Sequence, residues 1–193
     1  MFLWLISISQ SNKQAFDILS EEFPIHFTII PAQPWHFATF RTIELAAFET
    51  LRQAGAMSGP AGACSLDELA DFHRNGVLLA ACPPHSAPVG FIAGKIASEW
   101  LHIAEMDVHP NWQRRGIGRQ LIQAMLRNGQ QRGLTGATLT TDKMAAFNAR
   151  FYATLGFEIV EGKACPPHLA AIIEDEIAKG FDSARRVAMR IAF

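Results

Sequence analysis

Several features that mark particular protein classes are scarce in this sequence. Its three cysteines, Cys64, Cys82 and Cys165, form an odd and scattered set among 193 residues, so they predict neither a disulfide framework nor a zinc site. No apolar run approaches the ~20 residues that span a bilayer. The net charge of −1 gives no general attraction for nucleic acid or an anionic membrane. We therefore expect a protein of a reducing compartment, by default the cytoplasm.

The apolar and charged fractions, 49% and 18%, suit one globular domain with a sizeable core. We assign residues 25–193 to this single domain. Residues 1–24 carry no motif, and we interpret them as an N-terminal extension, either an extra helix or a tail. The apolar start Met1–Ile8 lacks a basic segment and a clear cleavage site, so we do not expect a signal peptide.

Apolar periodicity predicts strands interleaved with helices. The expected strands are 26–30, 77–82, 89–97, 101–108, 137–141, 157–161 and 187–193, and the expected helices are 34–52, 65–76, 117–131, 146–154 and 166–180. This order predicts a mixed α/β fold, a three-layer sandwich around one mixed sheet.

One segment combines a strand, a turn containing glycine and a helix. His102–Val108 is the predicted strand, and an apolar stripe from Ile117 to Met125 is the predicted helix. The first turn of such a helix leaves N–H groups unpaired, and an anion such as a pyrophosphate can bind there. Gly116 and Gly118 allow close approach of the backbone. A Gly-x-Gly pair alone is also typical of a plain tight turn.

Two motifs together resemble those of the GNAT superfamily of N-acetyltransferases. The acetyl-CoA loop of that family reads Gln/Arg-x-x-Gly-x-Gly/Ala, and Gln113, Gly116 and Gly118 stand at its fixed positions. Asn148–Phe157 matches the family's Asn-x-x-x-Tyr-x-x-x-Gly-Phe segment. The resemblance covers about residues 27–162. It implies a largely antiparallel sheet of six to seven strands flanked by helices, and acetyl-CoA as co-substrate.

The resemblance also implies how the cofactor is held. Its pantetheine arm would enter between the fourth and fifth strands, which splay apart in this family. The implied cofactor-binding residues are Met106, Val108, Gln113, Arg114, Arg115, Gly116, Ile117, Gly118, Arg119, Asn148 and Tyr152. From residue type alone, the three arginines are equally well solvated surface charges, and Asn148 is equally well a helix N-cap.

Tyr152 is the only tyrosine in the chain. In the family that the chain resembles, this position protonates the departing CoA thiolate. A phenol, with a reference pKa of ~10, can donate to a developing thiolate of comparable basicity. The alternative is a core tyrosine that packs beside Phe151.

An acceptor amine also needs a base, because an alkylammonium has no free lone pair. His102 is the first candidate and Glu105 the second; water is the alternative to both. An imidazole, with a reference pKa of ~6.5, suits this role. Strand geometry predicts that His102, Ala104, Met106 and Val108 share one face, with Glu105 on the other unless a bulge redirects it.

These residues predict an acetyl-CoA-dependent N-acetyltransferase that acetylates a primary amine of a small molecule by direct transfer. The alternatives are a protein or peptide N-acetyltransferase and a non-catalytic module that senses acyl-CoA. We expect the acceptor pocket to be formed by residues 53–64 and 163–182. The seven histidines have no metal-ligand spacing, so we expect no metal. We expect no nucleic-acid or membrane partner, and a homodimer is the default assembly.

Overall fold

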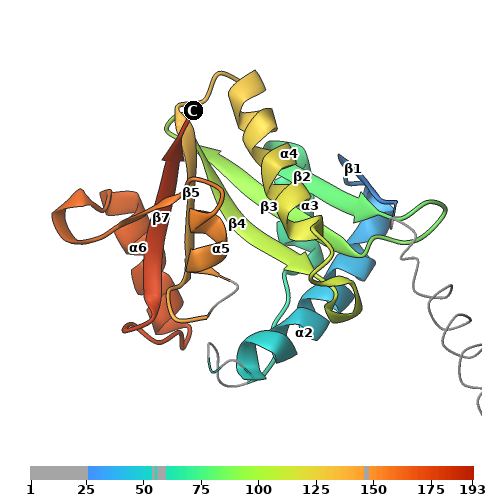
Figure 1. Ribbon diagram of the computed structural model, residues 1–193, viewed down its shortest axis with the longest axis horizontal. Coiled ribbons are helices and arrows are strands. Elements are labelled where there is room, and N and C mark those ends of the chain that lie inside the picture. Colours follow the sequence, from blue (N-terminus) through green and yellow to red (C-terminus); the bar gives the residue numbers. More distant parts are fainter. Residues whose placement is uncertain (1–25, 54, 56–59, 146–147) are drawn as a thin grey trace, which may run out of the picture.

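A seven-stranded sheet lies between two layers of helices (Figure 1). The computed structural model describes residues 26–53, 55, 60–145 and 148–193, so the predicted extension 1–24 lies outside the described residues. The strand order is β1-β2-β3-β4-β5-β7-β6. The strands are β1 (Thr28–Pro31), β2 (Val77–Cys82), β3 (Gly90–Ala97), β4 (Trp100–Val108), β5 (Gly136–Asp142), β6 (Glu158–Val160) and β7 (Arg186–Ala192). Neighbouring strands are antiparallel except β4 and β5, which confirms the predicted mixed, largely antiparallel sheet.

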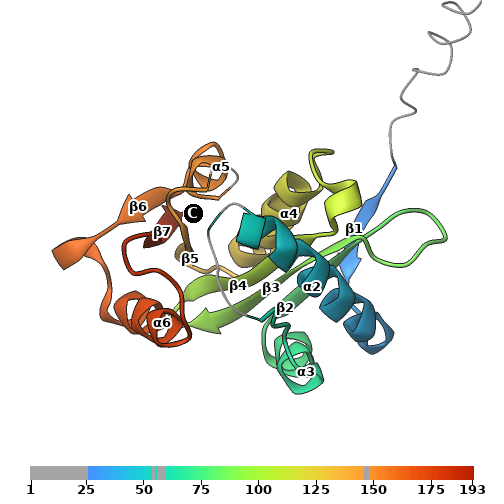
Figure 2. The same ribbon diagram turned by 90° about the horizontal axis from the view of Figure 1, so that it is seen from below.

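The helices cover both faces of this sheet (Figure 2). On one face lie α4 (Ile117–Gln131) and α5 (Ala149–Ala153), and on the other lie α2 (Phe37–Gln53), α3 (Leu66–Asn75) and α6 (Pro167–Ala178). Short 3-10 turns precede three of these helices within the described residues: η1 (Pro34–His36) before α2, η2 (Pro110–Trp112) before α4 and η3 (Gly162–Ala164) before α6. The predicted capping box is present, because Ser65 Oγ accepts from the Glu68 N–H and the Glu68 carboxylate accepts from the Ser65 N–H.

Most predicted boundaries differ from the observed ones by one or two residues. The largest difference occurs at a helix start, because the predicted helix 34–52 begins as the 3-10 turn η1. The predicted helix 146–154 is observed as α5 over Ala149–Ala153, and its first two residues, 146 and 147, lie outside the described residues. Pro31 ends the edge strand β1, where a residue without an N–H is tolerated. Within the part of the chain that the structure describes, no helix combines the length and apolarity needed to cross a bilayer.

Two apolar clusters hold the helices on the central strands. Ile117, Leu121 and Met125 of α4 are buried against the sheet, as the predicted stripe requires. On the opposite face, Phe40 of α2 stacks on Phe91 of β3 with ring centroids 4.7 Å apart. Each such ring removes a large apolar area from water, which stabilises the sandwich.

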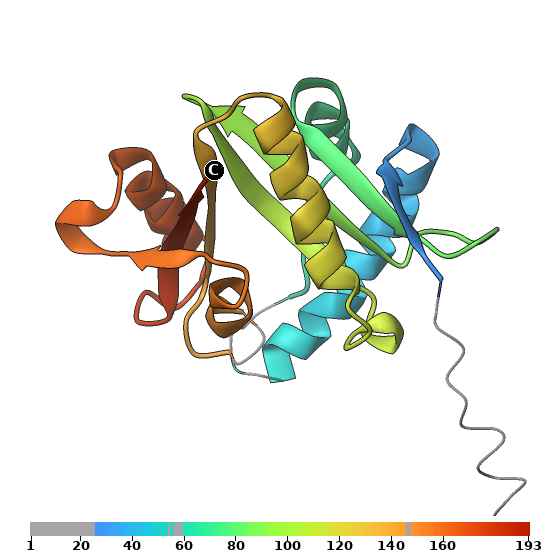
Figure 3. The same cartoon turned by 45° about the horizontal axis from the view of Figure 1, so that its top comes forward.

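The two parallel strands of the sheet separate along their length. β4 pairs with β5 only from Trp100 to Ile103, opposite Gly136 to Leu139. Beyond Ile103, β4 continues to Val108 without a partner in β5, and the strands diverge toward the start of α4 and toward α5 (Figure 3). The fold therefore opens a gap in the middle of its own sheet.

A β-bulge changes which side chains of β4 face which layer. In the pairing with β3, Ala93 lies opposite Glu105 whereas Gly94 lies opposite Ile103, so Ala104 is the extra residue. Met106 consequently packs in the cluster under α4 with Ile103, and Ala104 packs on the α2 side. The prediction that His102, Ala104, Met106 and Val108 share one face is therefore wrong, because a regular period of two does not survive the bulge.

Candidate active site

A cavity of about 760 Å³ occupies the gap between β4 and β5. It is lined by the diverging part of β4, the loop before α4, the first turn of α4 and residues of α5. Its other walls come from α2, from the segment after it and from the end of α6. The predicted site residues in its lining are Glu105, Met106, Val108, Gln113, Arg114, Gly116, Ile117, Gly118, Arg119, Asn148 and Tyr152. His102 and Arg115 do not line it.

The loop before α4 has a backbone shape suited to an anion. Arg114 and Gly116 both adopt the left-handed region, with φ of 64° and 79°, and such turns direct successive N–H groups into a concavity. Gly116 is the N-cap of α4 and offers no side-chain cap, so the first N–H groups of the helix remain available to a ligand. The Gln113 side-chain amide donates to the Val108 carbonyl at 3.0 Å, which ties the loop to the end of β4.

The arginines of this segment have different surroundings. Arg119 donates to the Thr154 hydroxyl at 2.9 Å, and Arg115 lies over the Trp112 ring, 5.1 Å from its centroid. Arg114 and Arg119 line the cavity, and all three guanidinium groups belong to exposed residues. Arg114 and Arg119 are therefore placed where they could neutralise phosphates, and Arg115 is a surface cation stacked on an aromatic ring.

Two residues of the second motif reach the cavity from α5. Asn148 occupies the N-cap position, but its side chain makes no capping hydrogen bond and instead lines the cavity. The Tyr152 ring packs edge-on against Phe151 and Phe157 and also lines the cavity. Burial, then the nearby carboxylates of Asp107 and Glu105, raises the pKa of Tyr152. Its phenol thus keeps its proton near neutral pH.

The residues predicted as bases lie in different environments. Burial, reinforced by Asp107 and Glu44, raises the pKa of Glu105 well above its usual range. Asp107, which also lines the cavity, has its pKa raised to about 8 by burial and by Glu44. His102 instead contacts the Thr138 hydroxyl through Nδ1 at 3.1 Å. Burial, then the charges of His168 and Lys95, lowers the pKa of His102 to about 4, so the imidazole is neutral near pH 7.

Glu44, Cys64 and Glu105 form a group with atoms that could hold a metal ion. One carboxylate oxygen of each glutamate and the Cys64 sulfur all lie within 4.8 Å of one another. Burial and the neighbouring carboxylates raise the pKa of the Cys64 thiol, which opposes the thiolate form that metals bind. Glu44 also accepts a hydrogen bond from the Cys64 N–H at 2.9 Å. The expectation of no metal therefore stays a prediction.

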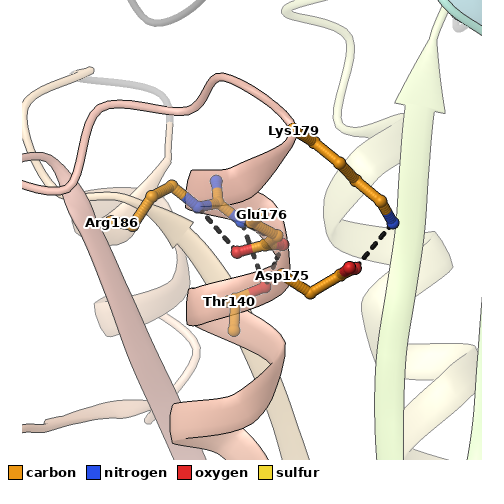
Figure 4. Close-up of polar contacts among 5 residues, drawn as sticks. All are labelled: Thr140, Asp175, Glu176, Lys179 and Arg186. Atoms are coloured by element: carbon orange, nitrogen blue, oxygen red, sulfur yellow. Dashed lines mark hydrogen bonds and ion pairs between the residues drawn. The ribbon is translucent and has the colours of Figure 1, made fainter.

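A network of ion pairs and hydrogen bonds connects α6 with β5 and β7 at one wall of the cavity (Figure 4). Arg186 binds both oxygens of Glu176, at 2.6 and 2.9 Å, and donates to the Thr140 hydroxyl at 3.0 Å. Thr140 in turn donates to Glu176 at 2.7 Å. The nearby Lys179 binds Asp175 at 2.6 Å. Glu176 is thus the partly buried ion-pair partner of Arg186.

Sequence reasoning missed three charged residues of the cavity wall, namely Glu44, Asp107 and Arg186. Two of them carried a signal in the sequence: Asp107 is a charged residue within an apolar strand, and Glu44 stands next to the apolar stripe of its helix. Of the segments predicted to form the acceptor pocket, 53–64 and 163–182, the residues Pro60, Gly62, Glu176, Lys179 and Phe181 line the cavity. Residues 54 and 56–59 lie outside the described residues, and the acceptor role of both segments stays a prediction.

Comparison with known proteins agrees with this geometry. The sequence profile of the acetyltransferase (GNAT) family matches residues 16–157. The chain belongs to the GNAT family. The GNAT fold is also found in PaiA N-acetyltransferase from Thermoplasma acidophilum, a structure in complex with coenzyme A. That structure has a TM-score of 0.67 and 14% identity, and the match covers 87% of this chain and 99% of that one.

Other GNAT structures with this fold act on different acceptors. The ribosomal-protein-S18-alanine N-acetyltransferase from Escherichia coli has a TM-score of 0.60 and 16% identity, over 86% of this chain and 94% of that one. N-acetylglutamate synthase from Neisseria gonorrhoeae, complexed with coenzyme A and N-acetyl-glutamate, has a TM-score of 0.63 and 15% identity, over 87% of this chain and 36% of that one. The protein is therefore an acyltransferase of the GNAT family, and its acceptor must be inferred from its own cavity.

Proposed function

We propose that this GNAT enzyme is an N-acetyltransferase that transfers the acetyl group of acetyl-CoA directly to a primary amine of a small molecule. The observation that carries this proposal is that one cavity is lined by the loop before α4, by Tyr152 and by Glu105. A cofactor held by its pyrophosphate at Gly116–Arg119 could lay its arm along β4, where the main chain beyond Ile103 lacks a β5 partner. Residues of α2 and of the end of α6 line the same cavity, and we assign the acceptor to that part of it.

In this proposal the amine nitrogen attacks the thioester carbonyl carbon, and the C–S bond then breaks. Glu105 takes the proton that the nitrogen must lose, and Tyr152 donates its proton to the departing CoA sulfur. A carboxyl group with a raised pKa is a stronger base than an ordinary one, and proton transfer of this kind contributes ~10²- to 10⁴-fold in rate. His102 remains the rival base from the sequence, but its contact with Thr138 and its position outside the cavity lining favour Glu105.

Calorimetry followed by a turnover assay tests this function. Acetyl-CoA titrated into the purified chain should bind one site with a Kd in the micromolar range, typical of enzyme co-substrates. Release of free CoA thiol is then measured with a panel of small amines and a panel of peptides. Binding followed by turnover on small amines supports the proposal. Binding without turnover on any acceptor would favour the acyl-CoA sensor, turnover on peptides alone would favour a peptide acetyltransferase, and absence of binding would overturn all three.

A further inference from the structure

The bulge at Ala104 gives β4 two acidic side chains on one face. Glu105 lies opposite Ala93 and Asp107 opposite Phe91, and both of those β3 residues pack on the α2 side of the sheet. Side chains directly opposite each other in an antiparallel pair share a face. Glu105 and Asp107 therefore both point toward α2, and both line the cavity.

Glu44 of α2 lies close to this acidic pair. A carboxylate oxygen of Glu44 lies within 4.8 Å of one of Glu105. Glu44 has the Cys64 N–H as a partner, but no side-chain hydrogen bond or ion pair joins Glu105 or Asp107 to any residue within the described ranges. Like charges this close oppose ionisation in a partly buried site. A partly buried carboxylate that faces a cavity and has no partner points to a ligand that supplies the missing positive charge.

Two cations of the cavity wall on the α6 side are already held in ion pairs. Arg186 is bound to Glu176, and Lys179 to Asp175. Arg114 and Arg119 lie beside the start of α4, where we place the cofactor phosphates, and Arg119 donates to Thr154. Arg41 and Arg186 act on the acidic group only at longer range than an ion pair. The group formed by Glu44, Glu105 and Asp107, which we call the acidic triad, thus has no ion-pair partner among the described residues, and a bound cation would favour its ionised form.

We propose that the acceptor is an amine with at least two ammonium groups and no carboxylate, held at the acidic triad. This inference rests on the proposed function. A monoamine loses its positive charge when its nitrogen is acetylated, whereas a diamine keeps one charge near the triad throughout the reaction. An acceptor with its own carboxylate would add a further negative charge to the site. Glu44 and Asp107 bind the acceptor, and Glu105 serves both binding and proton removal.

Three acceptors of equal chain length test the proposal: 1,5-diaminopentane, 1-aminopentane and 5-aminopentanoate. Thiol release is measured at saturating acetyl-CoA. We expect kcat/KM for the diamine to exceed that of the monoamine by about tenfold, which is the effect of one charge-assisted contact. The amino acid should be the poorest acceptor. Glu44→Gln should lower the diamine value about tenfold and the monoamine value less, and leave the acetyl-CoA Kd unchanged.

Glu49→Gln is the matched control, because Glu49 lies on the same helix with a side chain 46% exposed and paired to Arg52. It should leave all three values unchanged. Equal values for the three acceptors, or a preference for 5-aminopentanoate, would overturn the inference and leave the proposed function intact. This comparison uses the unaltered protein, so it stands even if Glu44→Gln fails to fold.

Two further results would rule out the amine inference for other reasons. If acetyl-CoA does not bind in calorimetry, the proposed function itself fails, and the inference fails with it. Because Glu44, Cys64 and Glu105 could also hold a metal ion, Zn²⁺ is titrated into the cofactor-free protein as well. Stoichiometric Zn²⁺ binding that Glu44→Gln abolishes would assign the acidic triad and Cys64 to a metal and overturn the amine inference.

Discussion

Glu105 and His102 belong to the same strand and, after the bulge, to the same face, yet they meet different surroundings. Glu105 faces the cavity together with Asp107 and Glu44, so its ionisation is opposed and its basicity increases. His102 lies where β4 is still paired with β5 and contacts Thr138 of that strand. A displacement of a few residues along one strand therefore separates a candidate base from a histidine in a structural position.

The choice between these two bases can be measured from the pH dependence of kcat/KM. The base must be ionised, so kcat/KM should rise with pH through the pKa of Glu105, which is higher than that of an ordinary glutamate. Glu105→Gln should reduce kcat/KM about 100-fold and remove this limb. His102→Gln can keep a hydrogen bond to Thr138 and should have the smaller effect. The reverse ranking would restore His102 as the base.

Tyr152 combines two roles that the sequence could not separate, because it packs between two phenylalanines and also borders the cavity. Tyr152→Phe keeps the ring packing and removes only the hydroxyl. We expect turnover to fall about 100-fold, as loss of a general acid predicts, with the acetyl-CoA Kd almost unchanged. Turnover that stays at the parent level across the pH range would show that the hydroxyl is not the acid.

At the scale of elements, the regular periodicities were readable from the sequence and the irregular ones were not. The helix stripe from Ile117 to Met125 fixes which face of α4 is buried, and the predicted bounds of that helix agree with the observed ones. The bulge at Ala104 left no signal in the residue pattern, because it depends on the pairing with β3. The partner of Glu176 was hidden for a similar reason, since Arg186 lies ten residues away in a different element.

The first turn of α4 permits a change that separates cofactor binding from stability. A Cβ added at Gly118 would meet only ordinary contacts, 3.7 Å from Met106 and 3.8 Å from Phe151. Gly118→Asp should therefore fold, and the helix dipole favours a negative charge there. The same charge would repel a pyrophosphate, so we expect the acetyl-CoA Kd to rise at least about tenfold in calorimetry. Unchanged affinity would place the phosphates elsewhere.

The contact of α6 with β5 and β7 depends on the ion pair between Arg186 and Glu176, whose side chains are 10% and 19% exposed. Arg186→Met leaves the carboxylate unpaired, and removal of one partner of a buried pair costs about 3 kcal/mol or more. The double change Arg186→Met with Glu176→Met should recover most of that loss, because no charge remains buried. Urea unfolding of the parent and of these two variants measures both effects. A double variant no more stable than the single one would contradict this account.

For the molecule as a whole, the acidic triad makes stability depend on pH in an unusual direction. The pKa of Asp107 is about 8 in the folded protein and ~3.9 in an unfolded chain. Between these values the folded state binds more protons, so the free energy of unfolding falls as pH rises from about 4 to about 8 and then levels off. The groups that face Asp107 are Glu44 of α2, Glu105 of β4 and Tyr152 of α5, none of which supplies positive charge.

Asp107→Asn removes this ionisation and should therefore stabilise the protein at pH 8 while leaving its stability near pH 4 unchanged. For a chain of this size, each kcal/mol gained raises the thermal midpoint by about 2 to 4 °C. Thermal unfolding of both proteins across this range measures the difference. If the triad binds diamines, 1,5-diaminopentane at pH 8 should raise the thermal midpoint of the parent protein more than that of Asp107→Asn. The ammonium groups offset the charge of the Asp107 carboxylate in the parent protein, whereas the asparagine variant has no charge there to offset. Equal shifts in the two proteins would remove Asp107 from the acceptor site.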